Sequence, residues 1–172
     1  MASPADVWLL GETKGFWINT GALVISILVA AAAIWSASSR ERKRSTLEFL
    51  NRRHVDKELI DAIRFVRHGL KDRADFSFVL LPDDDSAEMV KTALNYHEFV
   101  AQSIMQKALD EAMYKQMQYT NLMNFWRSAK PVVAYIREKT GVRTLYQDLE
   151  WLYERWHHDP IVPNTNRCFS RY

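Results

Sequence analysis

The feature that most constrains this chain is an uncharged apolar segment, FWINTGALVISILVAAAAIWSA, which runs from Phe16 to Ala37. About 20 helical residues, each rising about 1.5 Å, match a hydrocarbon core of roughly 30 Å. A helix satisfies its own backbone hydrogen bonds in that core, so the glycine and β-branched residues do not argue against one. Trp17 and Trp35 lie near the two ends, where indole rings prefer the headgroup layer. The sequence therefore predicts a transmembrane helix over residues 16–38.

A cleaved signal peptide is the alternative interpretation of this segment. The apolar run is longer than the roughly 7–15 residues usual in a signal peptide. The residues before it carry Asp6 and Glu12 against the single Lys14, whereas a signal peptide begins with a positively charged region. Both observations favour an uncleaved membrane anchor.

Four positively charged residues follow the apolar segment at once: Arg40, Arg42, Lys43 and Arg44. Positive residues are retained on the cytoplasmic side of a membrane, so we expect the N-terminus outside and everything after Ser39 inside. The same basic cluster would also attract anionic lipid headgroups at the membrane surface.

The composition of the chain favours a helical domain after the anchor. With 48% apolar and 26% charged residues, the chain is not expected to be disordered. Five Gly and five Pro are few for 172 residues, which argues against a turn-rich β fold. The net charge of +2 does not by itself imply a nucleic-acid partner. The single cysteine, Cys168, excludes an internal disulfide and a multi-cysteine metal site.

The first predicted helix of this domain follows "TLEFLNRRH", a piece that could simply extend the membrane helix. Asp56 is expected to be its N-cap. One helical face carries the apolar residues Leu59, Ile60, Ile63, Val66 and Leu70. The next apolar run, Phe76 to Pro82, is too short to assign to a strand, a packed loop or a turn of helix.

A long stretch without Gly or Pro, from Ser86 to Lys130, predicts either one very long helix or two helices joined near residues 102–109. Asp85 or Ser86 is expected to start it. Its second half carries an apolar stripe: Tyr119, Leu122, Met123 and Trp126. Pro131 fits the first turn of a new helix, where its missing N–H costs nothing, and Gly141 fits the residue after that helix ends.

The last predicted helix begins with Thr144 and Gln147 as a capping box and ends at Asp159-Pro160. Its apolar face consists of Leu145, Leu149, Leu152 and Trp156. The resulting fold class is all-α, with one N-terminal transmembrane helix followed by a small cytosolic helical bundle. The predicted parts are a short extracytoplasmic N-terminus (1–15), the transmembrane helix (16–38), a basic juxtamembrane segment (39–55), the helical domain (56–158) and a flexible tail (159–172).

The segment LNYHEFVAQSIMQKALDEAMYKQ resembles a bacterial family known only as domain of unknown function 4760. The matching residues are Leu94, Asn95, Tyr96, Glu98, Asp110, Glu111, Trp126, Pro131 and Arg137, followed by the closing YQDLEWLYERW. The resemblance covers roughly residues 45–156 and implies an N-terminal membrane helix, in the inner (plasma) membrane of a bacterium, with a helical domain behind it. The family has no established activity, so the resemblance implies no chemistry.

The tripeptide Arg67-His68-Gly69 is the sequence with which histidine phosphatases begin their active site. Such an enzyme needs the tripeptide at the end of a strand, with the histidine as phosphoryl acceptor. The residues before His68 have helical rather than alternating periodicity. We therefore favour the end of a helix closed by Gly69 over a phosphatase site.

A second candidate site is a polar cluster of residues that the family resemblance also includes: Asn95, Glu98, Asp110, Glu111 and Arg137. On one continuous helix Glu98 and Asp110 would lie about 18 Å apart, so only a turn between them could create a metal site. The alternative has Asp110 as the N-cap of a second helix and Glu98 bonded to a neighbouring helix, by Arg137 for example. His97 falls on the apolar face and is expected to be a core histidine.

Three functions remain open at this point. No catalytic residue, metal ligand or cofactor can be assigned, and six aromatic residues concentrate in the last helices: Tyr119, Trp126, Tyr146, Trp151, Tyr153 and Trp156. These observations favour a membrane-anchored module that binds another protein or itself. The alternative is a membrane-anchored hydrolase, acting through His68 or a Glu98/Asp110/Glu111 metal site. A third is a nucleic-acid or lipid-surface binder through residues 40–73, which hold eleven of the 23 Lys and Arg, although nucleic acid is not favoured.

Overall fold

The computed structural model describes residues 7–8, 12–71, 73, 75–81 and 83–161, with side chains from Phe16 onward. The predicted flexible tail lies outside the described residues from position 162 on. The chain divides into two compact units, Met1–Glu41 and Arg42–Tyr172, and each is described by itself.

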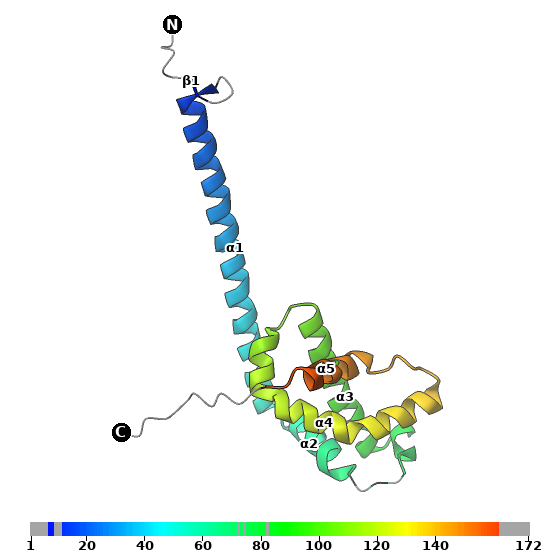
Figure 1. The fold of residues 1–172 in the computed structure, drawn as a ribbon. Helices are drawn as coiled ribbons and strands as arrows, with labels where there is room; N and C mark the ends of the chain where they lie inside the picture. The colour runs from blue at the N-terminus through cyan, green and yellow to red at the C-terminus, as the bar shows by residue number, and fades with distance from the viewer. Residues whose placement is uncertain (1–6, 9–11, 72, 74, 82, 162–172) are drawn as a thin grey trace. The chain divides into compact units, whose positions relative to one another are not determined.

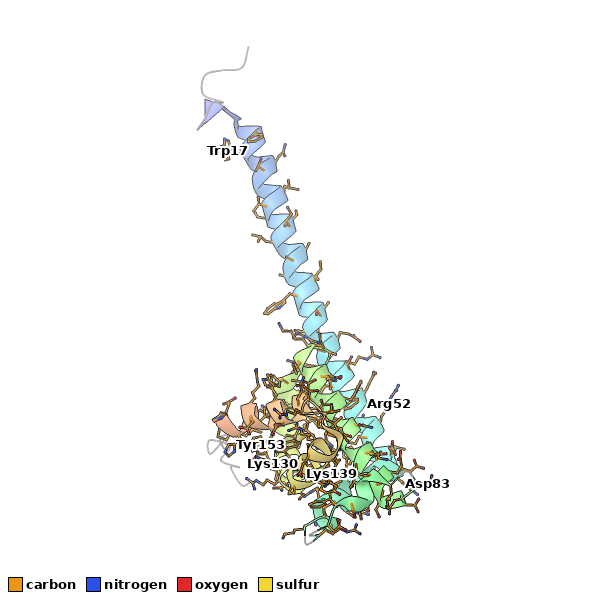
Figure 2. The ribbon with its side chains drawn as sticks, turned by 90° about the vertical axis from the view of Figure 1, so that its right-hand side faces the viewer. Trp17, Arg52, Asp83, Lys130, Lys139 and Tyr153 are labelled. Atoms are coloured by element: carbon orange, nitrogen blue, oxygen red, sulfur yellow. The ribbon has the colours of Figure 1, made fainter. Side chains whose placement is uncertain are left out.

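The first unit consists of two short strands and the first part of a long helix (Figure 1). Strands β1 (Val7–Trp8) and β2 (Glu12–Thr13) pair antiparallel and were not predicted. Helix α1 (Lys14–Val55) follows at once and contains one candidate membrane-spanning segment, in which an 18-residue window has a mean hydropathy of 2.0. The apolar side chains of its described part within the first unit are exposed, and Trp17 lies near the start of the helix (Figure 2).

The second unit begins within α1, which continues through the basic residues to Val55. The possibility that "TLEFLNRRH" extends the apolar helix is therefore confirmed. In this unit Leu50 is buried, and the ring of Phe49 stacks on Tyr96 with centroids 5.6 Å apart. These contacts join the last turns of α1 to the helical domain.

Helix α2 (Lys57–Arg64) starts where predicted, because the Asp56 carboxylate accepts a hydrogen bond from the Leu59 N–H at 3.0 Å. It passes directly into the π-helical turn η3 (Phe65–Gly69). The predicted apolar face is buried, with Ile60 half-buried at its edge. A short 3₁₀ helix, η4 (Ser77–Leu80), occupies the run that the sequence left unassigned.

The helix ends at Gly69, as predicted: the π turn η3 finishes there, with Leu70 as its C-cap in the right-handed region. A Cβ at Gly69 would lie 2.9 Å from the ring of Phe65. The glycine is therefore accounted for by this close approach, not by a left-handed backbone.

Two helices, α3 (Asp85–Met105) and α4 (Glu111–Thr140), cover the long stretch without glycine. The N-cap of α3 is Asp84, one residue before the predicted start, and its carboxylate accepts from the Ala87 N–H at 3.0 Å. The turn between the helices includes Lys107 in the left-handed region, with φ of 58°. α3 contacts both α2 and the last helix, α5 (Gln147–His158).

The sequence predicted that Pro131 begins a new helix, but the proline lies inside α4. The buried face runs past the proline without a break, because Ala129, Val132 and Val133 are all buried. Pro131 itself is exposed, so the carbonyl that loses its hydrogen-bond donor lies on the solvent side. Packing thus overrides the local preference, and α4 curves along its length (Figure 1).

The predicted capping box at Thr144 and Gln147 is also wrong. α5 begins after Tyr146, which has φ of 58° and provides no side-chain cap. The Glu98 carboxylate of α3 caps α5 instead, accepting from the N–H groups of Asp148 at 3.3 Å and Leu149 at 2.8 Å. Gly141, by contrast, ends α4 in the left-handed region with φ of 72°, as predicted.

The core of the second unit is built mainly from large aromatic and aliphatic side chains, of which Tyr114, Phe125, Trp126 and Trp156 are fully buried. His97 belongs to this core, as predicted, and is 2% exposed. Its ring stacks on Phe125 with centroids 3.8 Å apart. The domain that carries the candidate sites is therefore held by continuous packing among α2, α3, α4 and α5.

Candidate functional site

The N-terminus of α4 is fixed by two residues close in space but far apart in sequence. The Asp110 carboxylate accepts from the Met113 N–H at 2.9 Å and caps the helix, as predicted. The Asp110 N–H donates to the Thr46 hydroxyl at 2.9 Å, and that hydroxyl donates to the Arg42 carbonyl at 2.8 Å. The first turn of α4 is thereby tied to the part of α1 that begins the second unit.

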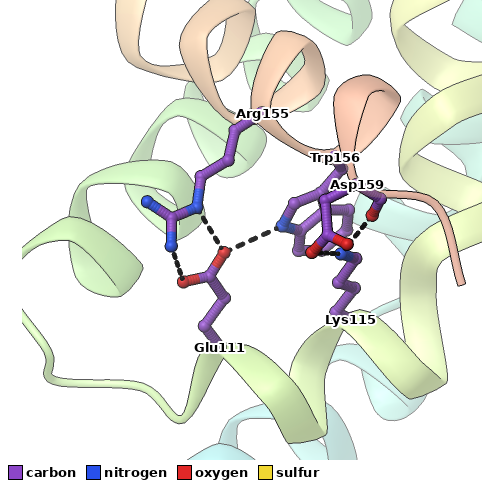
Figure 3. Close-up of polar contacts among 5 residues, drawn as sticks. All are labelled: Glu111, Lys115, Arg155, Trp156 and Asp159. Atoms are coloured by element: carbon purple, nitrogen blue, oxygen red, sulfur yellow. Dashed lines mark hydrogen bonds and ion pairs between the residues drawn. The ribbon is translucent and has the colours of Figure 1, made fainter.

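Glu111, the first residue of α4, binds the C-terminal half of α5 (Figure 3). Its two carboxylate oxygens accept from Arg155, at 2.9 Å from Nε and 3.1 Å from Nη2. One of them also accepts from the Trp156 indole N–H at 3.2 Å. This forked guanidinium–carboxylate geometry is the strong form of an ion pair. The Glu111 carboxylate therefore already has three donors.

One turn further along α4, Lys115 closes the end of α5 (Figure 3). Its ammonium group donates to the Asp159 carboxylate at 2.8 Å and to the Asp159 backbone carbonyl. The hydrogen bond from Lys115 lowers the pKa of Asp159 below its usual value. A cation at this position also complements the negative end of the helix.

A cavity of about 850 Å³, the α4–α5 groove, lies beside these ion pairs. Six apolar residues line it: Ile104, Met105, Leu109, Ala112, Trp151 and Ile161. Seven charged residues line it as well: Arg42, Lys107, Asp110, Glu111, Lys115, Arg155 and Asp159. Within the described part of the chain, Arg42 and Lys107 have no ion-pair partner, and the buried Nε of Arg42 has no hydrogen-bond acceptor.

The five residues of the predicted polar cluster do not form one site. Glu98 binds the first turn of α5, whereas Glu111 binds its last turns. Arg137 donates to the Leu145 carbonyl at 2.8 Å and to Glu150 at 2.7 Å, near the start of α5. Asn95 is exposed and makes no side-chain hydrogen bond to any residue that the structure describes.

The half-buried position of Glu98 is explained by its structural role as the cap of α5. Burial raises the pKa of its carboxyl group, while the two backbone N–H donors and the charge of Arg137 act in the opposite direction. Glu98 was expected to bond to a neighbouring helix, and the donors are backbone groups of α5 rather than Arg137. Among the described residues, no group of three or more His, Cys, Asp or Glu side chains could hold a metal ion.

The remaining candidates lie elsewhere on the two units. His68 is exposed on the π turn that follows α2, so a helix and not a strand precedes it. In the first unit, Arg40 donates to the Ser36 carbonyl at 3.4 Å. In the second, Arg44 pairs with Glu48 at 2.9 Å, and Lys43 is exposed. Of the basic cluster, Arg42 alone lines the α4–α5 groove.

A family model described as a domain of unknown function, DUF4760, matches residues 20–156. The chain belongs to the DUF4760 family. The match extends from the apolar part of α1 to Trp156 in α5, and so includes most of the residues that line the α4–α5 groove. No curated protein and no solved structure shows significant similarity to this chain. DUF4760 membership thus agrees with the sequence-based family resemblance and carries no assigned activity.

Several groove residues were not predicted as a site from the sequence, namely Lys115, Trp151, Arg155 and Asp159. The residues of α4 and their hydrogen-bond partners in or just after α5 are separated by 44 or 45 positions in the sequence. Periodicity shows which face of a helix a residue occupies, but not which other helix covers that face. The one available signal was the aromatic content of the last helix, which suggested a binding surface without placing its partner residues.

Proposed function

We propose that this DUF4760 protein is a single-pass protein of the bacterial inner membrane, with its N-terminus outside and its helical domain in the cytoplasm. The candidate span in α1 supports anchoring. The basic residues that follow it support the orientation, because Lys and Arg are retained on the cytoplasmic side. In this proposal the domain serves as a protein-interaction module at the membrane surface.

The observation that carries the interaction proposal is the composition of the α4–α5 groove. Its apolar members include Met105 and Trp151, which are 44% and 39% exposed. Exposed Trp and Met side chains beside Arg are typical of surfaces that bind proteins. The two cations without an ion-pair partner in the described chain, Arg42 and Lys107, favour an acidic group on the bound segment. The occupant that fits is a segment of another protein with apolar side chains and a carboxylate.

Each carboxylate of the groove already has a structural role, which supports a binding function for the groove over a catalytic one. Asp110 caps α4, Glu111 holds Arg155 and Trp156, and Asp159 holds Lys115. Removing any of these groups from its present role would leave a helix end or a cation without its partner. The groove therefore has a rigid polar rim built by the fold itself.

Site-specific photo-crosslinking of the full chain in cells tests this function. A photoreactive phenylalanine analogue at Met105 should give a discrete product, whereas the same analogue at Val142, which is 48% exposed outside the groove, should not. Lys107→Glu should weaken the Met105 product, because it reverses the charge that attracts the acidic group.

The mass of the product identifies the occupant. If the crosslinked product exceeds the mass of the chain by an amount that differs from the chain's own mass, the occupant is another protein, as proposed. A product of twice the chain mass would replace that partner by a second copy. The absence of any product specific to Met105 would contradict an interaction at the groove.

A further inference from the structure

A second polar depression is lined by residues of α4, of the α2–η3 segment and of the end of α1. It consists of two cavities of about 310 Å³ and 470 Å³. Both are lined by Arg67 and His68, so the two cavities are neighbours, and we call the pair the Arg67 trough. The trough thus contains the two residues of the Arg-His-Gly motif that carry side chains.

The lining of the Arg67 trough is positively charged. Its cations are Arg53, Arg64, Arg67, Lys71 and Arg127, joined by His54 and His68. No Asp or Glu among the described residues lines either cavity. Arg64 pairs with Asp61 at 2.7 Å, whereas the other four cations have no ion-pair partner in the part of the chain that the structure describes. Such a concentration of charge is unexpected in a chain of net charge +2 and would attract an anion.

Neutral amides hold the two central guanidinium groups in place. The Gln118 side-chain oxygen accepts from both Arg53 and Asn121, and Gln118 is only 6% exposed. The Asn121 side-chain oxygen in turn accepts from Arg67 at 3.5 Å. Because amides accept hydrogen bonds without carrying charge, this chain orients Arg53 and Arg67 and leaves their positive charge uncompensated. A network that served stability alone would have gained more from a carboxylate at position 118.

Two further contacts support the same arrangement. The Ser128 hydroxyl donates to the Arg67 carbonyl at 3.3 Å and ties the π turn to α4. The Arg53 guanidinium lies 5.6 Å from the centre of the Tyr96 ring. Both arginines are therefore positioned by their surroundings before any ligand arrives, which reduces the entropy lost on binding.

We propose that the Arg67 trough binds a ligand carrying two linked phosphate groups. Planar guanidinium groups match phosphate oxygens with paired hydrogen bonds. Arg67 lines both cavities, so the two linked phosphates occupy one cavity each and both bind the Arg67 guanidinium group. The apolar lining is aliphatic, with Ile60 and Ile63 in one cavity and Leu70 and Pro131 in the other. No Phe, Tyr or Trp ring among the described residues lines either cavity to provide a stacking surface for a base, so the trough recognises the phosphates themselves.

Calorimetric titration of the full chain in phosphatidylcholine nanodiscs with inorganic pyrophosphate tests this proposal. Arg67→Gln should weaken pyrophosphate binding at least tenfold. Gln118→Glu should weaken it to a similar extent with an unchanged or higher melting temperature, because its carboxylate pairs with Arg53. Arg52→Gln removes the same charge one residue away, on an exposed side chain outside the trough (Figure 2), and should change the affinity less than twofold.

The outcomes separate the possible sources of the phosphates. Nanodiscs containing diacylglycerol pyrophosphate should compete with pyrophosphate more strongly than nanodiscs of equal charge made with phosphatidylserine if a lipid headgroup supplies the linked phosphates. Equal competition by the two lipids assigns the site to a soluble ligand. The proposal is overturned if pyrophosphate does not bind at millimolar concentration, or if Arg67→Gln and Gln118→Glu bind it as the wild type does. Binding of a single-stranded oligonucleotide without pyrophosphate binding also overturns it.

Discussion

At the scale of single residues, His97 connects the packing of α3 and α4 with pH. Its Nδ1 lies 2.8 Å from the Ala93 carbonyl, and a carbonyl only accepts, so Nδ1 carries the hydrogen. The stacked ring of Phe125 covers one face of the imidazole. Burial lowers the pKa of His97 from 6.5 to about 3, so the folded domain keeps this histidine neutral.

The buried histidine predicts that the domain loses stability in mild acid. Between the folded pKa of about 3 and the unfolded value of 6.5, the unfolded chain binds more protons, so stability falls as the pH is lowered through this window. The contribution of His97 is about 1.4 kcal/mol per pH unit, or about 2 kcal/mol between pH 7 and pH 5. Denaturant titration of the full chain in detergent at the two pH values measures this loss. His97→Phe should lose that part of the pH dependence; an identical dependence in the variant would contradict the assignment.

Glu98 gives a second prediction at the residue scale, because it caps a helix to which it does not belong. Glu98→Ala leaves the N–H groups of Asp148 and Leu149 without their acceptor. We expect a loss of about 2 kcal/mol in the free energy of unfolding, as for other helix caps and charged hydrogen bonds. Glu98→Gln keeps one acceptor oxygen and should lose less. Asn95→Ala, on an exposed side chain of the same helix, is the control and should change stability by less than about 0.5 kcal/mol.

At the scale of elements, the sequence predicted those features that depend on residues close together in the chain, such as helix caps and buried helix faces. Asp56 and Asp110 cap their helices as expected, and the buried face of α2 follows its apolar periodicity. The cap of α5 was not predictable in this way, since Glu98 lies 50 residues before Asp148. The same reason applies to the candidate site: its ion pairs join α4 to α5, and one sequence does not reveal which helices meet.

Pro131 illustrates the opposite failure, in which a strong local signal was overruled. The residues around it bury a continuous face against the core, and that burial outweighs one missing hydrogen bond. Pro131→Ala restores the N–H to an exposed position of α4. We expect the free energy of unfolding to rise by about 1–2 kcal/mol, less than the full helix penalty of proline, because alanine also loosens the unfolded chain. A loss of stability in denaturant titration would show instead that the curvature of α4 is required for packing.

At the scale of the whole molecule, the chain combines an apolar helix with a helical domain that carries two polar depressions. The α4–α5 groove combines exposed apolar side chains with ion pairs, whereas the Arg67 trough holds cations on neutral amides. Both lie within the second unit, so in the proposed topology both are on the side of the membrane that holds the chain after Ser39. The proposed orientation therefore decides which partners and ligands either of them can meet.

The accessibility of cysteines in spheroplasts tests that orientation most directly. Cys168 is the one cysteine of the sequence, and Ser3→Cys in a Cys168→Ser background places a single thiol at the other end. A membrane-impermeant maleimide should label position 3 in intact spheroplasts and Cys168 only after the membrane is opened. Labelling of Cys168 in intact spheroplasts, with position 3 protected, would contradict a cytoplasmic helical domain.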